Sequence, residues 1–96
     1  MAEDGLRIDK WLWRARFFKT RGLAAKTVSK GVRLNGARTE KSHALVRPGD
    51  VLTFKQANDV RVIRVEALGE RRGPAVEAQG LYTDLDAAAT EGPTAP

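Results

Sequence analysis

The stretch GVRLNGART, residues 31–39, decides the fold predicted for this chain. At its centre, Asn35-Gly36 is the strongest short-range signal for a β-hairpin, because both residues tolerate the positive φ that a tight turn requires. The triplets at 32–34 and 37–39 alternate in side-chain type as short strands do. We therefore expect a hairpin here. Gly31, which directly precedes it, is expected to end a helix, because glycine is the usual residue after a helix C-terminus.

Two amphipathic helices are expected before this hairpin. Apolar residues recur at helical spacing from Ile8 to Phe18, and Trp11 falls on their stripe, which places it in the core. Thr20 is the expected N-cap of a second helix, which runs to Lys30. We expect the two helices to lie antiparallel.

Turns and strands are expected to alternate after the hairpin. Residues 47–50, Arg-Pro-Gly-Asp, form a turn in which Asp50 is expected to accept backbone N–H bonds. Strand-like segments follow at 51–54 and 60–65, with a further turn between them. A short helix, interrupted by a glycine, is expected within 75–82.

Positive charge is concentrated in one part of the chain. The segment from Arg7 to Arg47 holds twelve Lys or Arg residues and only two acids, Asp9 and Glu40, which gives it a charge of +10. The whole chain carries +5, so the remaining residues sum to −5. A solvated surface normally mixes both signs, whereas clustered cations attract phosphate and release its condensed counterions. The pattern predicts a polyanionic partner, RNA or DNA.

The composition gives little support to other classes of function. At 96 residues the chain allows one domain with a modest core, and it holds no cysteine for a disulfide or a zinc site. The single histidine, His43, is expected in an exposed loop, and the carboxylates are too scattered for an acid/base pair or a metal site. We expect no catalysis, no metal and no cofactor.

We expect a soluble, cytoplasmic protein that does not associate with membranes. The first residues, Met-Ala-Glu-Asp-Gly, lack the cationic start and apolar core of a secretory signal. No apolar run approaches the roughly 20 residues needed to span a bilayer. A membrane-surface helix at 8–18, where Trp and Arg are interleaved, is the alternative to this interpretation.

In order and spacing these features resemble the S4-type, or alpha-L, RNA-binding domain. The matching segments are RIDKWL at 7–12, Thr20-Arg21 with Ala24-Ala25, GVRLNG at 31–36 and VRPGDV at 46–51. The resemblance covers residues 7–54. It implies an α+β fold in which two helices pack on a small, bent, mostly antiparallel sheet and a basic surface binds RNA.

A closer resemblance extends to about Tyr82. Residues 10–21, KWLWRARFFKTR, together with QAND at 56–59 and RRGPAVEA at 71–78, are similar to the bacterial fifteen-kilodalton heat-shock proteins. That family implies a ribosome-associated protein that binds large subunits carrying a stalled nascent chain on transfer RNA and helps to recycle them under heat stress. Its members often continue into a long basic extension, whereas this chain ends in an acidic, low-complexity tail.

The chain is expected to divide into four parts. Residues 1–6 are expected to be a flexible amino terminus, 7–66 the S4-type domain, 67–82 an extension with a short helix, and 83–96 a disordered acidic tail. The free protein is expected to be a monomer.

The resemblance places RNA contacts at the start of both helices and on the hairpin, where cations are abundant. Arginine suits phosphate through its bidentate fork and lysine as a point charge, and backbone N–H groups at the start of the second helix add anion-binding capacity. The candidate RNA-binding residues are Arg7, Lys10, Trp13, Arg14, Arg16, Lys19, Thr20, Arg21, Lys26, Lys30, Arg33, Asn35, Gly36, Arg38 and Lys41.

Some of these residues have a structural alternative. Trp13, like the neighbouring Phe17, either stacks on a base or packs against the carboxy-terminal segment. Asn35-Gly36 serves the turn, although its glycine also admits a phosphate close to the backbone. Asp9, beside the first cations, is expected to orient a neighbouring Arg or Lys.

Two other functions compete with ribosomal RNA binding. RNA-modifying enzymes carry such a domain beside a large catalytic domain, but the residues after Phe54 are too few to form one. A helix-turn-helix DNA binder also has two short helices, but Arg-Gly-Leu-Ala-Ala at 21–25 offers few side chains that read base edges. A generic RNA- or DNA-binding module without a role in recycling is the remaining alternative.

Overall fold

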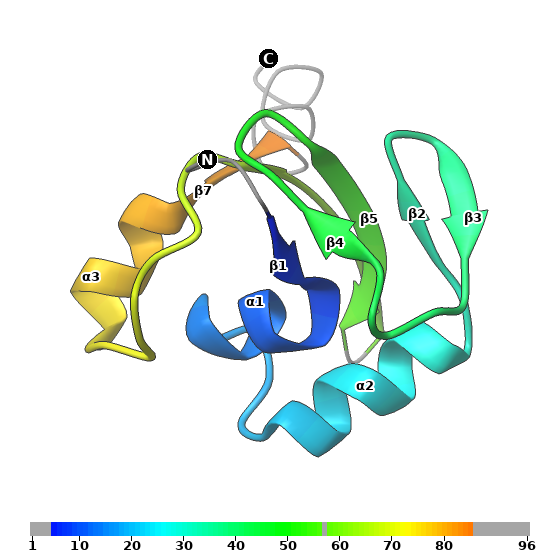
Figure 1. Ribbon diagram of the computed structural model, residues 1–96, viewed down its shortest axis with the longest axis horizontal. Coiled ribbons are helices and arrows are strands. Elements are labelled where there is room, and N and C mark those ends of the chain that lie inside the picture. Colours follow the sequence, from blue (N-terminus) through cyan, green and yellow to red (C-terminus); the bar gives the residue numbers. More distant parts are fainter. Residues whose placement is uncertain (1–4, 57, 86–96) are drawn as a thin grey trace, which may run out of the picture.

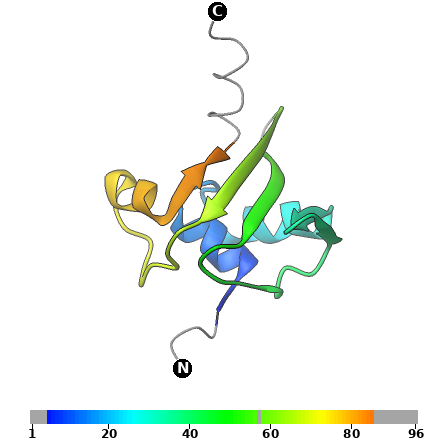
Figure 2. The same ribbon diagram turned by 90° about the horizontal axis from the view of Figure 1, so that it is seen from above.

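The computed structural model describes residues 5–56 and 58–85, which form an α+β fold (Figure 1). Its elements are, in chain order, β1 (Leu6–Arg7), α1 (Ile8–Arg14), α2 (Arg21–Ser29), β2 (Val32–Leu34), β3 (Ala37–Thr39), β4 (Leu45–Val46), β5 (Val51–Gln56), β6 (Asp59–Val65), α3 (Ala75–Ala78), the 3-10 turn η1 (Gln79–Leu81) and β7 (Tyr82–Asp84). Helix α1 packs beside α2, and α2 contacts β2 and β5. The β2–β3 hairpin and α3 lie at opposite ends of the molecule (Figures 1 and 2). The predicted fold class is confirmed.

The strands form two antiparallel sheets. Five of them pair in the order β3-β2-β5-β6-β7, and β1 pairs separately with β4. In the β2–β3 hairpin, Leu34 is opposite Ala37, and the two residues between them have positive φ: 54° at Asn35 and 88° at Gly36. These are the signs that a type I′ turn requires. The hairpin predicted from the Asn-Gly pair is confirmed.

Helix α1 ends earlier than its apolar spacing predicts. It stops at Arg14, because Arg16 adopts a left-handed conformation with φ of 66°. The N–H of Arg16 donates to the Trp13 carbonyl (3.1 Å) and the N–H of Phe17 to the Leu12 carbonyl (3.0 Å), which together make a Schellman motif. Glycine usually fills the left-handed position, and an arginine there costs about 1–2 kcal/mol. The expectation of a helix to Phe18 is therefore wrong.

The early turn swings Phe17 into the core. Phe17 is 6% exposed, and its ring lies 5.1 Å from that of Phe54, 4.6 Å from that of Tyr82 and 6.1 Å from that of Trp11. The cluster joins α1 to β5 and β7, which come from distant parts of the chain. Trp11 is fully buried, as predicted, and for Phe17 the packing alternative holds rather than base stacking.

Two turns are bonded to each other through their side chains. Asp50 accepts the Arg47 N–H through Oδ2 (2.9 Å) and the Asn35 side-chain amide through Oδ1 (3.1 Å). In return, the Asn35 Oδ1 accepts the Val51 N–H (2.8 Å). The predicted capping role of Asp50 is confirmed. The bonds also use both ends of the Asn35 amide, which fixes the hairpin against β5.

The expected limits of the folded domain need correction at both ends. Leu6 was expected in a flexible amino terminus, but it pairs with Val46. The expected acidic tail begins inside the sheet, because Thr83 and Asp84 belong to β7 and Asp84 accepts a hydrogen bond from Arg61 (2.7 Å). The other residues of these two expected segments, apart from 5 and 85, lie outside the described residues. The short helix expected within 75–82 is present as α3, followed by η1.

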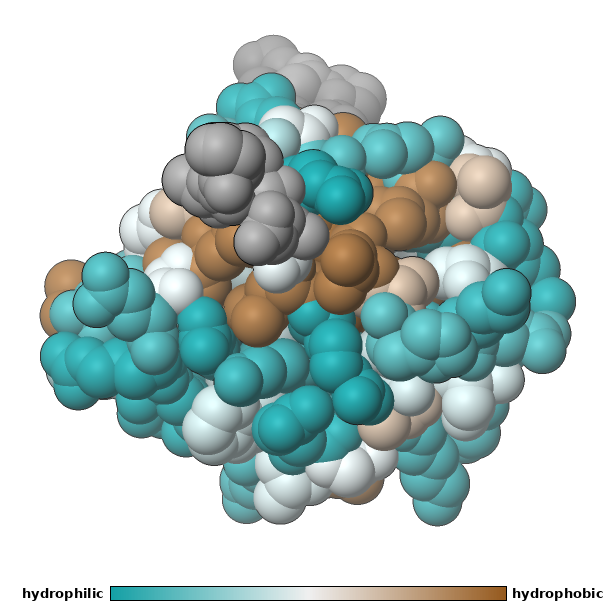
Figure 3. Space-filling view, in the orientation of Figure 1, coloured by the Kyte–Doolittle hydropathy of each residue, from teal (hydrophilic) through white to brown (hydrophobic). Residues whose placement is uncertain are grey.

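One face of the molecule carries apolar surface. In Figure 3 an apolar band crosses the middle of this face over β1 and β4, where Leu45 is 43% exposed. Hydrophilic side chains cover most of the area below and beside it. Among the helices in the described part of the chain, each is too short or too polar to cross a membrane.

Candidate nucleic-acid interface

Two arginines meet on one buried carboxylate at the amino-terminal end of α1. Asp9 is 3% exposed, and Arg7 donates to it through Nε (3.1 Å) and Nη2 (2.9 Å). The Nη2 of Arg21, the first residue of α2, lies 3.7 Å from the same carboxylate. We call Arg7, Asp9 and Arg21 the Asp9 cluster. The expectation that Asp9 orients a neighbouring arginine is confirmed, and the cluster still carries a net positive charge.

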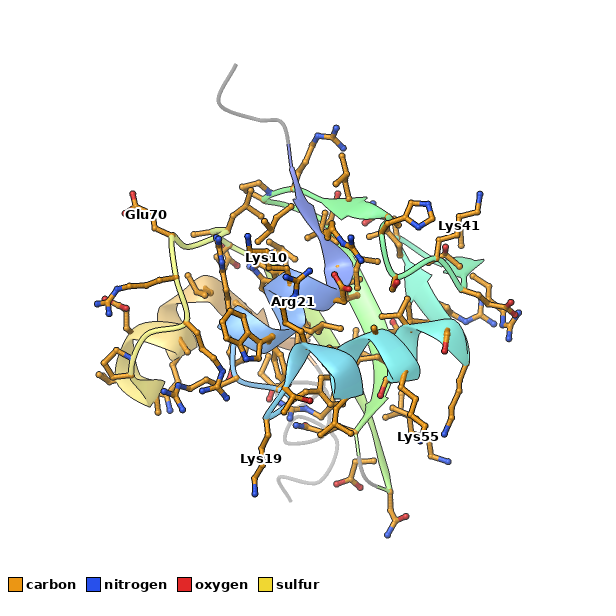
Figure 4. All side chains as sticks on the ribbon, turned by 60° about the horizontal axis from the view of Figure 1, so that its bottom comes forward. Lys10, Lys19, Arg21, Lys41, Lys55 and Glu70 are labelled. Carbon is orange, nitrogen blue, oxygen red and sulfur yellow. The ribbon has the colours of Figure 1, made fainter. Side chains whose placement is uncertain are left out.

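The loop after β3 fixes this end of α1. The N–H of Ile8 donates to the Ala44 carbonyl (2.8 Å) and that of Asp9 to the Ser42 carbonyl (3.4 Å). The same loop presents Lys41, and α1 presents Lys10 directly after Asp9. Figure 4 shows Lys10 and Arg21 close together, with Lys41 on the same side of α2. Arg7, Lys10 and Arg21 therefore lie at this end of α1, and Lys41 lies farther away on the same side of α2 (Figure 4).

The start of α2 adds an anion-binding helix terminus to the same region. Thr20 is its N-cap, as predicted, because the Thr20 hydroxyl oxygen accepts the Leu23 N–H (3.0 Å). Helix amino termini carry a partial positive charge and N–H groups that have no partner within the helix. The hydroxyl of Thr20 serves the cap, so Thr20 contributes to the region mainly by setting the direction of α2 and of Arg21.

The other end of α1 uses its arginines differently. Arg14 donates through Nη1 to the Gly69 carbonyl (2.6 Å), and Arg16 donates through Nε to the Gly73 carbonyl (2.6 Å). Trp11 donates through Nε1 to the Ala67 carbonyl (2.9 Å). These bonds hold residues 67–73 against the helix, and we call this segment the strap. Arg14 therefore does not join Arg7 and Lys10 in one row, although helical spacing predicts that it shares their side.

Trp13 is covered by the same strap. The Arg72 guanidinium lies over the Trp13 ring at 5.6 Å from its centroid, and Arg72 Nε donates to the Trp13 carbonyl (3.1 Å). A second bond runs from Arg72 Nη2 to the Phe18 carbonyl (3.4 Å). Packing against the carboxy-terminal segment, one of the two roles expected for Trp13, is thus present in the structure.

The arginines of the β2–β3 hairpin also make local contacts. Arg33 donates through Nη1 to the Gly36 carbonyl (3.1 Å). Arg38 pairs with Glu40 (2.5 Å) and donates through Nη2 to the Lys30 carbonyl (3.2 Å), which ties the hairpin to the end of α2. Gly36 is open: a side chain built there would meet nothing within 4 Å. A phosphate can therefore approach the turn backbone closely.

Lysines and arginines differ in whether their charged groups are bonded to other described residues. Each of the eleven arginines makes a hydrogen bond, an ion pair or a ring contact. No side-chain hydrogen bond or ion pair within the described part of the chain involves the ammonium group of Lys10, Lys19, Lys26, Lys30, Lys41 or Lys55. All six reach the surface, and only Lys10 is partly covered. The lysines therefore keep their charged groups for a ligand, whereas the arginines also serve the fold.

Sequence reasoning missed one of these lysines, Lys55. In β5 the side chains of Leu52 and Phe54 are buried, so Lys55 falls on the other face of the strand and is exposed. The period of two between buried residues was the available signal. Lys19 and Lys55 lie on the opposite side of α2 from Lys10 and Lys41 (Figure 4). The cations thus surround α2 and do not line a single groove. Within residues 5–56 and 58–85, no group of three acidic, His or Cys residues is placed to hold a metal ion.

Known proteins resemble this chain in sequence and in fold. The S4 domain family model matches residues 6–52. A solved structure of heat shock protein 15 from Vibrio cholerae, described as trimeric, is similar with a TM-score of 0.81 at 39% identity, and the match covers 92% of this chain and 89% of that one. The chain belongs to the heat shock protein 15 family.

Curated relatives extend the comparison. Heat shock protein 15 of Escherichia coli strain K12 is 46% identical over 80 residues, which is 82% of this chain and 59% of the relative. This chain therefore spans about three fifths of that relative's length. The small ribosomal subunit protein uS4 of Xanthobacter autotrophicus is 38% identical over 84 residues, 84% of this chain and 38% of that protein.

Proposed function

We propose that this chain is a non-catalytic RNA-binding protein that works in the cytoplasm on the ribosome. The observation that carries the proposal is the Asp9 cluster, in which Arg7 and Arg21 from different elements are held by one buried carboxylate. Lys10 follows Asp9 directly and Lys41 lies on the same side of α2, and neither ammonium group has an acidic partner in the described residues. A surface that fixes some cations and leaves others mobile suits a phosphate backbone of defined shape.

Recognition rests on phosphate and shape. Arg7 gives Nε and Nη2 to Asp9, so the planar guanidinium keeps Nη1 on its far side for a second acceptor. A pre-oriented fork loses less side-chain entropy when it binds a phosphate than a mobile side chain does. Few uncharged hydrogen-bonding side chains accompany these cations, and base-edge readout therefore contributes little. Structured RNA with closely spaced phosphates is the ligand that such a surface fits.

The fifteen candidate residues fall into two groups under this proposal. Arg7, Lys10, Arg21 and Lys41 contact RNA at the Asp9 cluster, and Lys19, Lys26, Lys30, Arg33, Gly36 and Arg38 extend the contact along α2 and the hairpin. Trp13, Arg14, Arg16, Thr20 and Asn35 support the surface, because their polar groups or rings are bonded within the fold.

The proposed role is the recycling of large ribosomal subunits that carry a nascent chain on transfer RNA under heat stress. Membership of the heat shock protein 15 family and the similarity to a ribosomal protein support a ribosomal site of action. Association with separated ribosomal subunits, with and without peptidyl transfer RNA on the large one, tests this in a sedimentation experiment. We expect co-migration with the occupied large subunit. Equal binding to any RNA would leave only a generic binding module.

We propose that the free chain is a monomer. The like charges of its basic segment oppose self-association at low salt. The relative from Vibrio cholerae, described as trimeric, is the contrary case. Light scattering during gel filtration decides between them, and a mass three times that of the chain would overturn the monomer.

A further inference from the structure

A groove lies at the carboxy-terminal end of α2, near Lys55, which is on the opposite side of α2 from Lys10 and Lys41 (Figure 4). It consists of two adjoining hollows that share Gly31 and Lys55. One, of about 370 Å³, lies between Phe18, Thr27 and Lys30, and the other, of about 280 Å³, extends to Val60. We call these hollows together the α2–β5 groove. Each is close to the lower end of the size range of small-ligand pockets, roughly 300–1,000 Å³.

The groove is positively charged and has no opposing acid. Lys30 comes from the end of α2 and Lys55 from β5, and both are exposed. Neither ammonium group has a partner among the described residues, and no Asp or Glu lines either hollow. Two lysines that approach one hollow from different elements favour an anionic group between them.

The same groove offers apolar surface beside the two lysines. Phe18 is partly exposed, and its ring lies 6.0 Å from the buried ring of Phe54, which supports it from below. Val60 is 56% exposed on the far wall. A partly exposed aromatic ring next to unpaired cations is the combination that single-stranded nucleic-acid sites use, because every base has a face that stacks.

The wall of the groove is held in place by the hairpin. Arg38 lies across Gly31, where an added Cβ would come within 2.5 Å of the Arg38 guanidinium. Arg38 also donates to the Lys30 carbonyl, and so joins the hairpin to the end of α2. Arg38 therefore links the hairpin to the α2 wall of the groove.

We propose that the α2–β5 groove binds an unpaired nucleotide of RNA, with a phosphate between Lys30 and Lys55 and a base against Phe18, which lines the same hollow as both lysines. The site is separate from the Asp9 cluster. It lies at the carboxy-terminal end of α2, whereas Arg21 of the cluster is the first residue of that helix. The proposal rests on the proposed RNA-binding function and adds the class of RNA: a helical element with an unpaired nucleotide next to it.

Two RNAs test the groove by fluorescence anisotropy: a blunt RNA duplex, and the same duplex extended by a short run of unpaired uridines. We expect wild-type protein to bind the extended RNA about three- to tenfold more tightly. Lys55→Gln and Phe18→Leu are each expected to remove most of that gain and to leave binding of the blunt duplex nearly unchanged. Circular-dichroism melting checks that Phe18→Leu is folded at the assay temperature.

Lys10→Gln is the matched control, because it removes the same charge from the other side of α2. It is expected to weaken binding of both RNAs by the same factor. The proposed groove site would be overturned if wild-type protein bound the extended RNA no more tightly than the blunt duplex. It would also be overturned if both groove variants kept the higher affinity for the extended RNA. Lys10→Gln without effect on the blunt duplex would instead overturn the Asp9 surface, and the two failures are therefore distinguishable.

Discussion

The two ends of α1 are equally rich in arginine but use it in opposite ways. At the amino-terminal end, Arg7 and Arg21 meet the carboxylate of Asp9, and their side chains stay 47% and 43% exposed. At the carboxy-terminal end, Arg14 and Arg16 donate to backbone carbonyls of residues 69 and 73. The first end keeps guanidinium groups at the surface in a fixed orientation. At the second end, the guanidinium groups are hydrogen-bonded to the extension and hold it in place.

The difference shows that charge alone does not identify a binding surface in this chain. At the two ends of α1, the acceptor that each arginine reaches decides its role. A buried carboxylate uses part of the guanidinium fork and leaves the rest outside, whereas the carbonyls of residues 69 and 73 bind the Arg14 and Arg16 guanidinium groups to the extension. The first end is therefore expected to govern affinity for RNA, and the second to govern stability.

The largest expected effect is on stability at the carboxy-terminal end. Trp11→Phe removes the hydrogen bond to the Ala67 carbonyl and leaves space around a fully buried ring. We expect a loss of about 2–4 kcal/mol in the free energy of unfolding, measured by urea denaturation. RNA affinity at low temperature, where the variant is still folded, should be unchanged.

Trp13→Phe is the matched control for that variant. It makes the same substitution two residues away, where the ring is partly exposed and packs against Arg72. The expected loss is under about 1 kcal/mol, the size of an exposed cation–π contact. Equal losses in the two variants would show that the strap does not depend on Trp11.

An intermediate effect is expected at the amino-terminal end. Asp9→Asn raises the net charge by one but leaves Arg7 and Arg21 without a counter-charge, and the arginines lose their fixed orientation. We expect a stability loss of about 1–2 kcal/mol, limited because the arginines are half exposed. RNA affinity should fall about three- to tenfold in filter binding, against the direction of the charge change.

Glu40→Gln makes the same charge change on the exposed Arg38 pair of the hairpin. The RNA affinity of the Glu40→Gln variant should stay unchanged or rise slightly, since no buried carboxylate is lost. If Asp9→Asn bound RNA more tightly and matched Glu40→Gln, net charge would explain binding without any orientation of Arg7 and Arg21.

The smallest expected effect concerns pH and the root of the extension. The Thr83 hydroxyl and then Arg64 donate hydrogen bonds to Glu66, and they lower its pKa below the usual 4.5. A lowered native pKa stabilises the fold above the ordinary pKa, and this contribution is lost as the pH falls through the native value. Melting temperature should therefore fall slightly less between pH 7 and pH 3 in Glu66→Gln than in wild type. An equal fall in melting temperature in the variant and in wild type would show that Glu66 does not anchor β7.

Features with a local cause could be predicted from the sequence. The hairpin follows from Asn35-Gly36, the start of α2 from the Thr20 cap, and the burial of Trp11 from its place in the apolar stripe. Each depends on residues within one turn or one helix. The orientation of an arginine by Asp9 was also predictable, because Arg7 lies two residues away.

Features that depend on distant residues could not be predicted in the same way. The end of α1 is set by an arginine in a left-handed conformation, where sequence rules look for glycine. The partners of Arg14 and Arg16 lie 55 and 57 residues along the chain, so their helical spacing was compatible with either an RNA-binding or a structural role. Lys55 was missed because it lies on β5, outside the segment between Arg7 and Arg47.

The salt dependence of RNA binding by two charge-matched double variants tests the central claim most directly. Lys10→Gln/Arg21→Gln and Arg14→Gln/Arg16→Gln each remove two positive charges, one pair from each end of α1. We predict that the log–log slope of affinity against salt falls by about two units in the first variant and by less than about half a unit in the second. Equal reductions in both would contradict the division of α1 into a binding end and a structural end.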